Sequence, residues 1–151
     1  MYKFIIYPIL IVLLLFTSLD QLSNHAALIH YYSYKYAVNR ATHAAAMQLD
    51  KEALADGHIV IDEYEAQLAA RQLLNLNLEK DSYTITFFEV VHVESENVPY
   101  HYVNKQWNIE LYLYKPAVIL VISTELPHMI KSKPSFLWNI FGTSEVVSSF
   151  K

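Results

Sequence analysis

Residues 36–57 read YAVNRATHAAAMQLDKEALADG, and this alanine-rich stretch predicts the helical part of the fold. From Ile9 to Asp56 the chain contains neither glycine nor proline, the two residues that most weaken helices. We therefore predict one nearly continuous helix that starts in the N-terminal apolar segment and ends at Gly57, because glycine favours helix ends. The weakest point of this helix is expected between Asp20 and Ser23.

Along this helix, apolar and small residues recur at alternating spacings of four and three, which is typical of one helix side with roughly heptad period. Small side chains let a second helix approach closely, so the sequence predicts an interaction face. The face consists of Ala37, Ala41, Ala44, Ala45 and Gln48. The alternative is packing on the protein's own second helix. We favour internal packing for the outer part and contact with another protein nearer the membrane.

The first 22 residues predict a membrane anchor. The apolar run FIIYPILIVLLLFTSL, Phe4 to Leu19, would rise about 24 Å as a helix, and flanking residues extend it toward the roughly 30 Å of a hydrocarbon core. A cleavable signal peptide is the alternative, although Asn24 to Ala26 is a poor cleavage site. Lys3 precedes the run and the next basic residue is Lys35, which predicts a cytoplasmic N-terminus with the remaining chain outside.

A second helix is predicted from Glu63 to Leu76, and Asp62 is its expected N-cap. Its apolar face follows the helical template of spacings. The face residues are Ala66, Ala69, Ala70, Leu73 and Leu74. Residues 23–81 would then form an extracytoplasmic helical hairpin.

Residues 82–151 predict a small antiparallel β-sheet that belongs to the same domain, which makes the fold class α+β. Tyr83, Ile85 and Phe87 alternate as inward residues of a first strand, with a bulge expected at Phe88 and Glu89. A second strand is predicted over residues 107–113. The run AVILVIS, residues 117–123, is apolar on both faces and indicates a covered central strand. A last strand is expected at residues 145–150.

The segment HMIKSKPSFLWNIFG, residues 128–142, concentrates large apolar side chains after two lysines. Ser135 could cap a short helix here and Gly142 could end it. The side chains could form a satellite core. The alternative is a patch for a partner or the membrane surface. Its residues are Phe136, Leu137, Trp138 and Phe141.

Composition excludes several functional classes. The 11 Lys and Arg residues are scattered, which argues against nucleic-acid binding, and the absence of cysteine excludes disulfides and thiolate chemistry. Two glycines cannot form a glycine-rich phosphate loop. His92, Glu94 and Glu96 could face one side of a strand, where we expect a solvated surface rather than a metal site. His101 is expected in an aromatic loop. We predict no enzyme, cofactor or metal.

The arrangement of one span, a long alanine-rich helix containing NRATHAAAMQLD, a second helix and a C-terminal sheet resembles the TadE-like minor pseudopilins. These are components of tight-adherence pilus systems related to type IV pilins. The span departs from type IV pilins because Phe4 to Leu19 contains no acidic residue.

The resemblance implies a non-catalytic assembly protein at the outer side of a cell membrane, with the lipid bilayer and pilus-assembly proteins as partners. The alternative function is a membrane-tethered binding module that recognises a ligand or an envelope partner.

Overall fold

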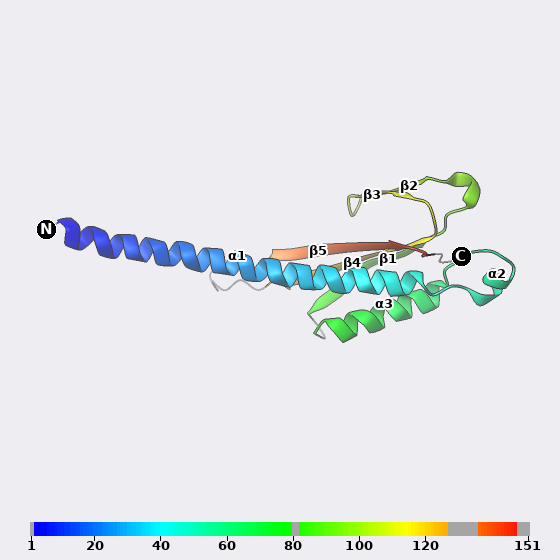
Figure 1. The fold of residues 1–151 in the computed structure, drawn as a ribbon, viewed down its shortest axis with the longest axis horizontal. Coiled ribbons are helices and arrows are strands. Elements are labelled where there is room, and N and C mark those ends of the chain that lie inside the picture. Colours follow the sequence, from blue (N-terminus) through cyan, green and yellow to red (C-terminus); the bar gives the residue numbers. More distant parts are fainter. Residues whose placement is uncertain (1, 80–81, 127–135, 148–151) are drawn as a thin grey trace.

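The computed structural model describes residues 2–79, 82–126 and 136–147. Its elements form three layers, which Figure 1 shows side-on: a helical layer, a three-stranded sheet and a two-stranded hairpin. The N-terminal part of the longest helix, α1, projects well beyond these layers. As predicted, the fold is α+β with a long apolar helix, shorter helices and small antiparallel sheets.

Helix α1 spans Tyr2–Ala46, so it ends well before the predicted end at Gly57. The chain stops being helical because Leu49 forms a β-bridge with Ile61, which is buried in the core. Asp50 then caps the short helix α2, Lys51–Ala55, by accepting bonds from two backbone amides. Gly57 does follow a helix and has a positive φ of 84°, but it follows α2 rather than α1. Tertiary contacts thus override helix propensity at residues 47–49.

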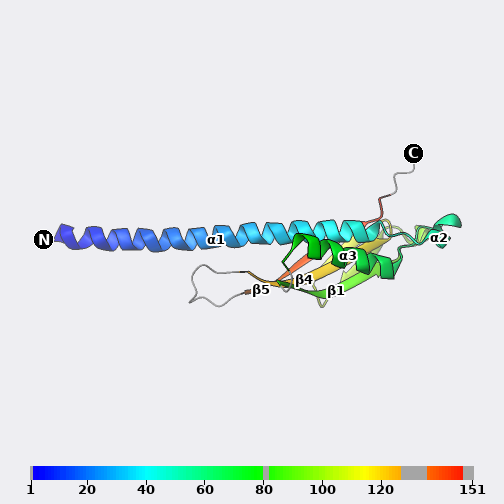
Figure 2. The same ribbon diagram turned by 90° about the horizontal axis from the view of Figure 1, so that it is seen from below.

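Helix α3, Glu63–Asn77, confirms the predicted second helix. The carboxylate of Asp62 accepts a hydrogen bond from the Glu65 amide at 3.0 Å, which is the predicted N-cap. Ala66, Ala70 and Leu74 are fully buried on the side of α3 that joins the core cluster with α1. Figure 2 shows α1 and α3 together on one face of the sheet.

The three-stranded sheet has the order β1-β4-β5, with β1 at Tyr83–Val91, β4 at Ala117–Leu126 and β5 at Phe136–Glu145. The prediction of a covered central strand is confirmed. Side chains of β4 alternate between the helical core and the hairpin core.

The bulge in β1 lies between Ile85 and Phe87 rather than at the predicted position. Phe87 therefore packs on the hairpin side, opposite Tyr83 and Ile85, and was wrongly predicted to share their face.

The prediction for residues 136–147 was wrong. Residues 136–145 form strand β5, paired with β4, instead of a short helix followed by a strand. Val146 and Val147 lie beyond the strand, and residues 148–150 are outside the described residues. Gly142 does not end a helix. A side chain there would place its Cβ atom 2.6 Å from Cγ1 of Val38, so glycine permits α1 to cross the sheet closely.

Strands β2, Tyr100–Asn104, and β3, Ile109–Leu113, form a separate hairpin over the other face of the sheet. The segment around His101 was wrongly predicted as a loop, because it pairs with the predicted strand. Trp107 belongs to the turn rather than to the strand. The side chain of Asn104 accepts bonds from the amides of Gln106 and Trp107 and thereby closes this turn. A short 3₁₀ helix, Ser95–Asn97, connects β1 to the hairpin.

Candidate membrane and protein interface

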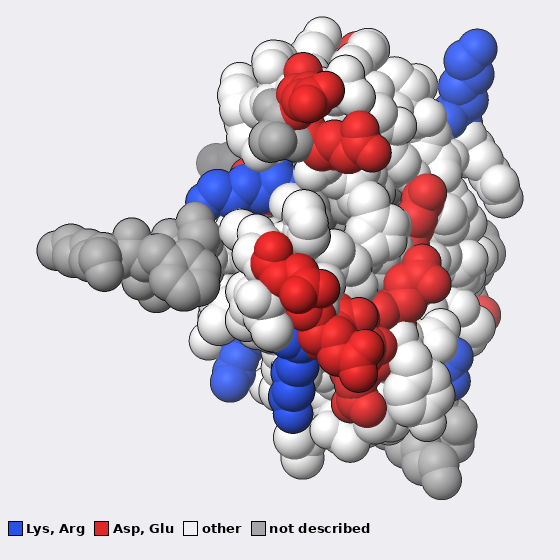
Figure 3. Space-filling model, turned by 90° about the vertical axis from the view of Figure 1, so that its right-hand side faces the viewer, with Lys and Arg blue, Asp and Glu red and all other residues white. Residues whose placement is uncertain are grey.

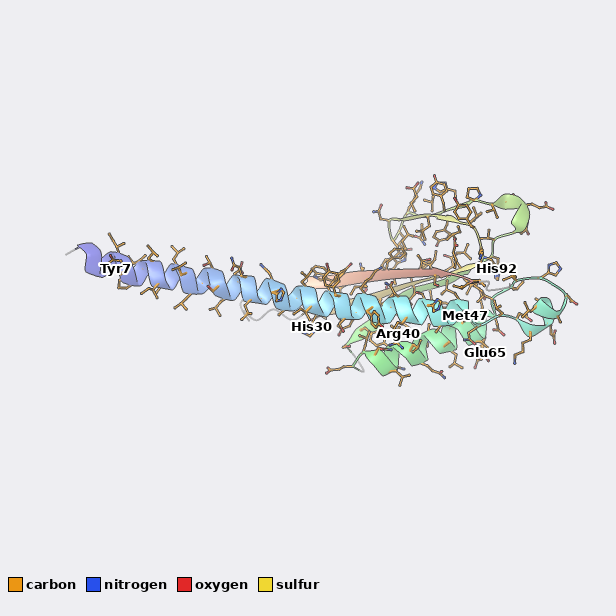
Figure 4. The ribbon with its side chains drawn as sticks, viewed as in Figure 1. Tyr7, His30, Arg40, Met47, Glu65 and His92 are labelled. Carbon is orange, nitrogen blue, oxygen red and sulfur yellow. The ribbon has the colours of Figure 1, made fainter. Side chains whose placement is uncertain are left out.

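The N-terminal half of α1 exposes its apolar side chains on every side. Within the described residues, α1 is the one helix that is long and apolar enough to cross a membrane. From Ile6 to Leu19 its large apolar side chains are at least half exposed, whereas a core helix would bury them. A signal sequence near an N-terminus meets the same criterion of length and composition. Figure 4 shows Tyr7 on this half, which no other described element accompanies.

The buried-membrane requirement for polar groups is met within the helix at Thr17. The Thr17 hydroxyl donates to the carbonyl oxygens of Leu13 and Leu14, at 3.1 and 2.9 Å. A helix also pairs its own backbone groups, which a bilayer requires. A shallow hollow of about 410 Å³ beside Pro8 is lined by apolar side chains and Thr17. Its apolar lining suits lipid or another apolar helix and offers no catalytic group.

The alanine face predicted for protein contact lies largely inside the molecule. Ala37, Ala41 and Ala45 are at most 1% exposed and belong to the core with α3 and the sheet. Ala44 and Gln48 are partly exposed, and the Gln48 amide donates to the Ala44 carbonyl at 3.1 Å. The internal-packing alternative therefore describes the three buried alanines, which offer no free surface to another protein.

A second face of α1 stays open just beyond the apolar span, and the sequence analysis missed it. It consists of Leu28, Ile29, Tyr32 and Tyr36, which we call the aromatic face. These side chains are between 46% and 63% exposed. Their spacing places them on one helix side, roughly opposite the core-facing Val38 and Ala41. The sequence did contain a signal for this face. The tyrosines within residues 31–36 are distributed over both sides of the helix, and only one side can face the core.

The predicted apolar patch on β5 divides between the two sides of the sheet. Trp138 is 39% exposed and its ring lies 5.4 Å from the ring of Tyr31 on α1. Leu137 is 66% exposed, and Phe141 packs partly against the hairpin core. The side chain of Phe136 is outside the described residues. The patch is thus part satellite core and part open surface.

Lys35 marks the boundary between the bare and packed parts of α1. Its ammonium group donates to the carbonyl oxygen of Phe141 and lies 4.9 Å from the centre of the Phe141 ring. Partial burial removes water from the ammonium group and lowers the pKa of Lys35 below its usual value. The side chain fastens α1 to the edge of β5.

Titratable groups elsewhere hold the hairpin in place. The Tyr102 hydroxyl donates to the carboxylate of Glu89 on β1, and burial followed by this bond raises the pKa of Tyr102 to about 12. His101 lies 3.0 Å from Glu110 and stacks on Tyr112, with the ring centres 4.6 Å apart. The two contacts of His101 are cross-strand contacts within the hairpin, where His101 remains exposed, whereas the Tyr102–Glu89 bond joins the hairpin to β1.

The side chains of His92, Glu94 and Glu96 are all exposed, as predicted for a solvated surface. They follow β1 rather than sharing a strand face, because β1 ends at Val91. Among the described residues, no group of three or more His, Asp or Glu side chains could hold a metal ion. Acidic side chains form a band at the end of the molecule farthest from the N-terminus (Figure 3). There, Asp50, Glu52, Asp62 and Glu65 line a hollow of about 470 Å³.

Comparisons with protein families, with curated proteins and with solved structures found no match for this chain.

Proposed function

We propose that this chain is a single-pass membrane protein that holds an α+β domain outside the bilayer and acts in assembly. Its aromatic face on α1 would contact a helix of another membrane protein. The observation that carries the proposal is the exposure of Leu28, Ile29, Tyr32 and Tyr36 on a helix that continues directly from the apolar span. A partner helix that crosses the same bilayer can run alongside both segments.

Distance favours a protein over lipid as the occupant of the aromatic face. Tyr32 lies 12 residues beyond Asp20, so its Cα is about 18 Å further along the helix. The headgroup layer on each side of a bilayer is only about 5–8 Å thick. An upright α1 therefore carries Tyr32 and Tyr36 beyond the lipids, where exposed aromatic side chains are typical of protein interfaces.

The orientation with a cytoplasmic N-terminus is part of the proposal and rests on Lys3. The TadE-like resemblance supports an assembly role, because it implies helix contacts rather than catalysis. Protease treatment of intact cells is expected to digest the domain beyond Asp20, and complete protection of the domain would contradict this orientation.

Cysteine crosslinking in membranes tests the helix contact, and the natural chain has no cysteine to interfere. Ile29→Cys and Tyr32→Cys, labelled with a maleimide that carries a benzophenone, are expected to form crosslinks to another polypeptide on irradiation, because the excited ketone inserts into C–H bonds and needs no thiol on the partner. Leu76→Cys is the matched control, because Leu76 is an 80% exposed apolar residue on α3, away from the aromatic face. Equal labelling of all three cysteines by a monofunctional maleimide, with no crosslink at residues 29 and 32, would refute the contact.

A further inference from the structure

A single line of exposed residues runs along α1 from the apolar span to the aromatic face. Successive members are three or four residues apart, which keeps them on one side of a helix with about 3.6 residues per turn. We call this line the open seam, and it consists of Ile11, Leu14, Ser18, Leu22, His25, Ile29, Tyr32 and Tyr36. All of them are exposed, and the apolar and aromatic members are between 53% and 63% exposed. The seam therefore joins the membrane segment to the outer helix as one surface.

The open seam lies on the side of α1 that faces away from the domain. Ala41 and Ala45, which belong to the core, occupy the opposite side of the helix. Figure 2 shows the sheet and α3 on one side of α1, and no described helix or strand alongside the seam on the other. The seam ends at Tyr36, because Arg40 turns toward α3, where its Nη1 atom lies 3.5 Å from Oδ1 of Asn77. A second helix can thus lie along the whole seam without meeting the domain.

The open seam carries no permanently charged side chain. Within residues 11–36 the only Asp, Glu, Lys or Arg residues are Asp20 and Lys35. Asp20 is two residues from the seam member on either side of it, which places it on the far side of the helix. The Lys35 ammonium donates to the Phe141 carbonyl and so points toward β5. Two copies of this chain can therefore bring their seams together without opposing like charges.

The polar groups of the seam can bond to their own copies. Serine and tyrosine hydroxyls both donate and accept hydrogen bonds, and a neutral imidazole carries one donor and one acceptor nitrogen. Ser18, His25 and Tyr32 supply such groups. Ser18 lies within the apolar span, where a hydroxyl stabilises contact between helices. A second copy therefore offers everything that the seam needs from a partner: apolar surface, matching donors and acceptors, and no charge.

We propose that the partner helix is α1 of a second copy of this chain, packed parallel and in register along the open seam. The proposal rests on the helix contact and the orientation proposed above, because copies anchored in the same direction hold the same residues at the same depth. The pair has a twofold axis along the seam, so each seam residue faces its own copy. The two domains then point away from each other.

Disulfide formation in membranes tests the in-register pairing, since the natural chain has no cysteine. Ile29→Cys and Tyr36→Cys are expected to give a reducible dimer of the chain on mild oxidation, because each cysteine faces its own copy. His30→Cys is the control, because His30 is also exposed but points about 100° away from Ile29 around the helix. Equal amounts of dimer at all three positions, or none at residues 29 and 36, overturn the proposal.

The same variants separate a second copy from a different partner protein. The expected result is the disulfide dimer together with benzophenone products at twice the mass of the chain. Benzophenone crosslinks from residues 29 and 32 to a polypeptide of another mass, without the disulfide dimer, would overturn the second copy and leave the proposed function standing. Absence of both kinds of product would overturn both.

Charge exchange at the centre of the seam tests whether position 29 meets its own copy. Ile29→Lys and Ile29→Glu each place two like charges opposite one another, and each is expected to weaken self-association about tenfold. A mixture of the two variants pairs lysine with glutamate and should restore association to within about threefold of the natural chain. Tyr64→Lys is the control, because Tyr64 is 74% exposed on α3, away from the seam.

Energy transfer between copies labelled at Leu76→Cys in phosphatidylcholine vesicles measures this association, because Leu76 is exposed on α3 and outside the seam. The labelled natural chain and the Tyr64→Lys control are expected to show equal transfer. No transfer by the natural chain, no loss with Ile29→Lys, or a mixture that associates no more tightly than either charged variant alone overturns the proposal.

Discussion

The two halves of α1 differ in their surroundings although both are rich in apolar residues. The apolar side chains of residues 6–19, which we call the bare half, are exposed. Those that face inward between Ala37 and Ala46, the packed half, are buried against α3 and the sheet. The bare half carries bulky side chains, and the packed half carries alanine at most contact positions. Small side chains allow close approach of helix and sheet. Bulky side chains without a partner in the chain are typical of contact with lipid or another protein.

A matched pair of valines tests this difference most directly. Val38→Ala removes two methyl groups from a fully buried position, and we expect it to lower the free energy of unfolding by about 2 kcal/mol. Val12→Ala makes the same change where the side chain is half exposed, and we expect a change below about 0.5 kcal/mol. Urea unfolding of both variants in detergent micelles, followed by tryptophan fluorescence, measures the two effects. Equal losses would show that the bare half also packs within the domain.

The closeness of α1 to β5 predicts a cost for the smallest possible side chain at Gly142. The added Cβ would meet Val38 Cγ1 at 2.6 Å, so Gly142→Ala should destabilise the domain by about 1.5 kcal/mol. Combined with Val38→Ala, the loss should be clearly smaller than the sum of the single losses, because the shortened side chain at position 38 leaves room for the new methyl group. The same unfolding measurement on the double variant checks this coupling. Additive losses would contradict a direct contact between the two positions.

The packed half of α1 also depends on α3, which the Asp62 cap begins. Asp62→Ala removes the acceptor for the Glu65 amide and should cost about 1 kcal/mol. Asp62→Asn, which retains an acceptor, should cost much less. Thermal unfolding of the two variants distinguishes the loss of the cap from the loss of a charge. Equal destabilisation by both substitutions would assign the effect to charge.

The sequence predicted those parts of the fold whose local pattern and tertiary role agree. Glu63 to Leu76 has a cap and one apolar face, and β4 is apolar on both faces, so both were predicted correctly. Residues 136–145 were assigned wrongly, because Ser135 and Gly142 resemble helix caps. In the fold, Gly142 serves instead for the crossing of α1. A close approach between distant segments leaves no periodic signal in the sequence.

The candidate interface was only partly predictable for a similar reason. Alanine spacing identified one helix side correctly, but it could not say whether the neighbour belongs to the same chain. The fold settles this for Ala37, Ala41 and Ala45 by burying them, which leaves the aromatic face as the open side of α1.

Lys35, at the boundary between the two halves, gives the smallest expected effect. Burial lowers its pKa in the folded state below the usual 10.5, so the unfolded chain binds more protons between those two values. Stability should therefore rise with pH through this window and level off above 10.5. Lys35→Arg stays charged throughout, so its stability serves as the reference in which the titration of other groups cancels. Urea unfolding of both proteins over this pH range measures the effect. If the difference in unfolding free energy between the natural chain and Lys35→Arg stays constant up to pH 10.5, Lys35 is fully hydrated and the packed half of α1 begins only after it.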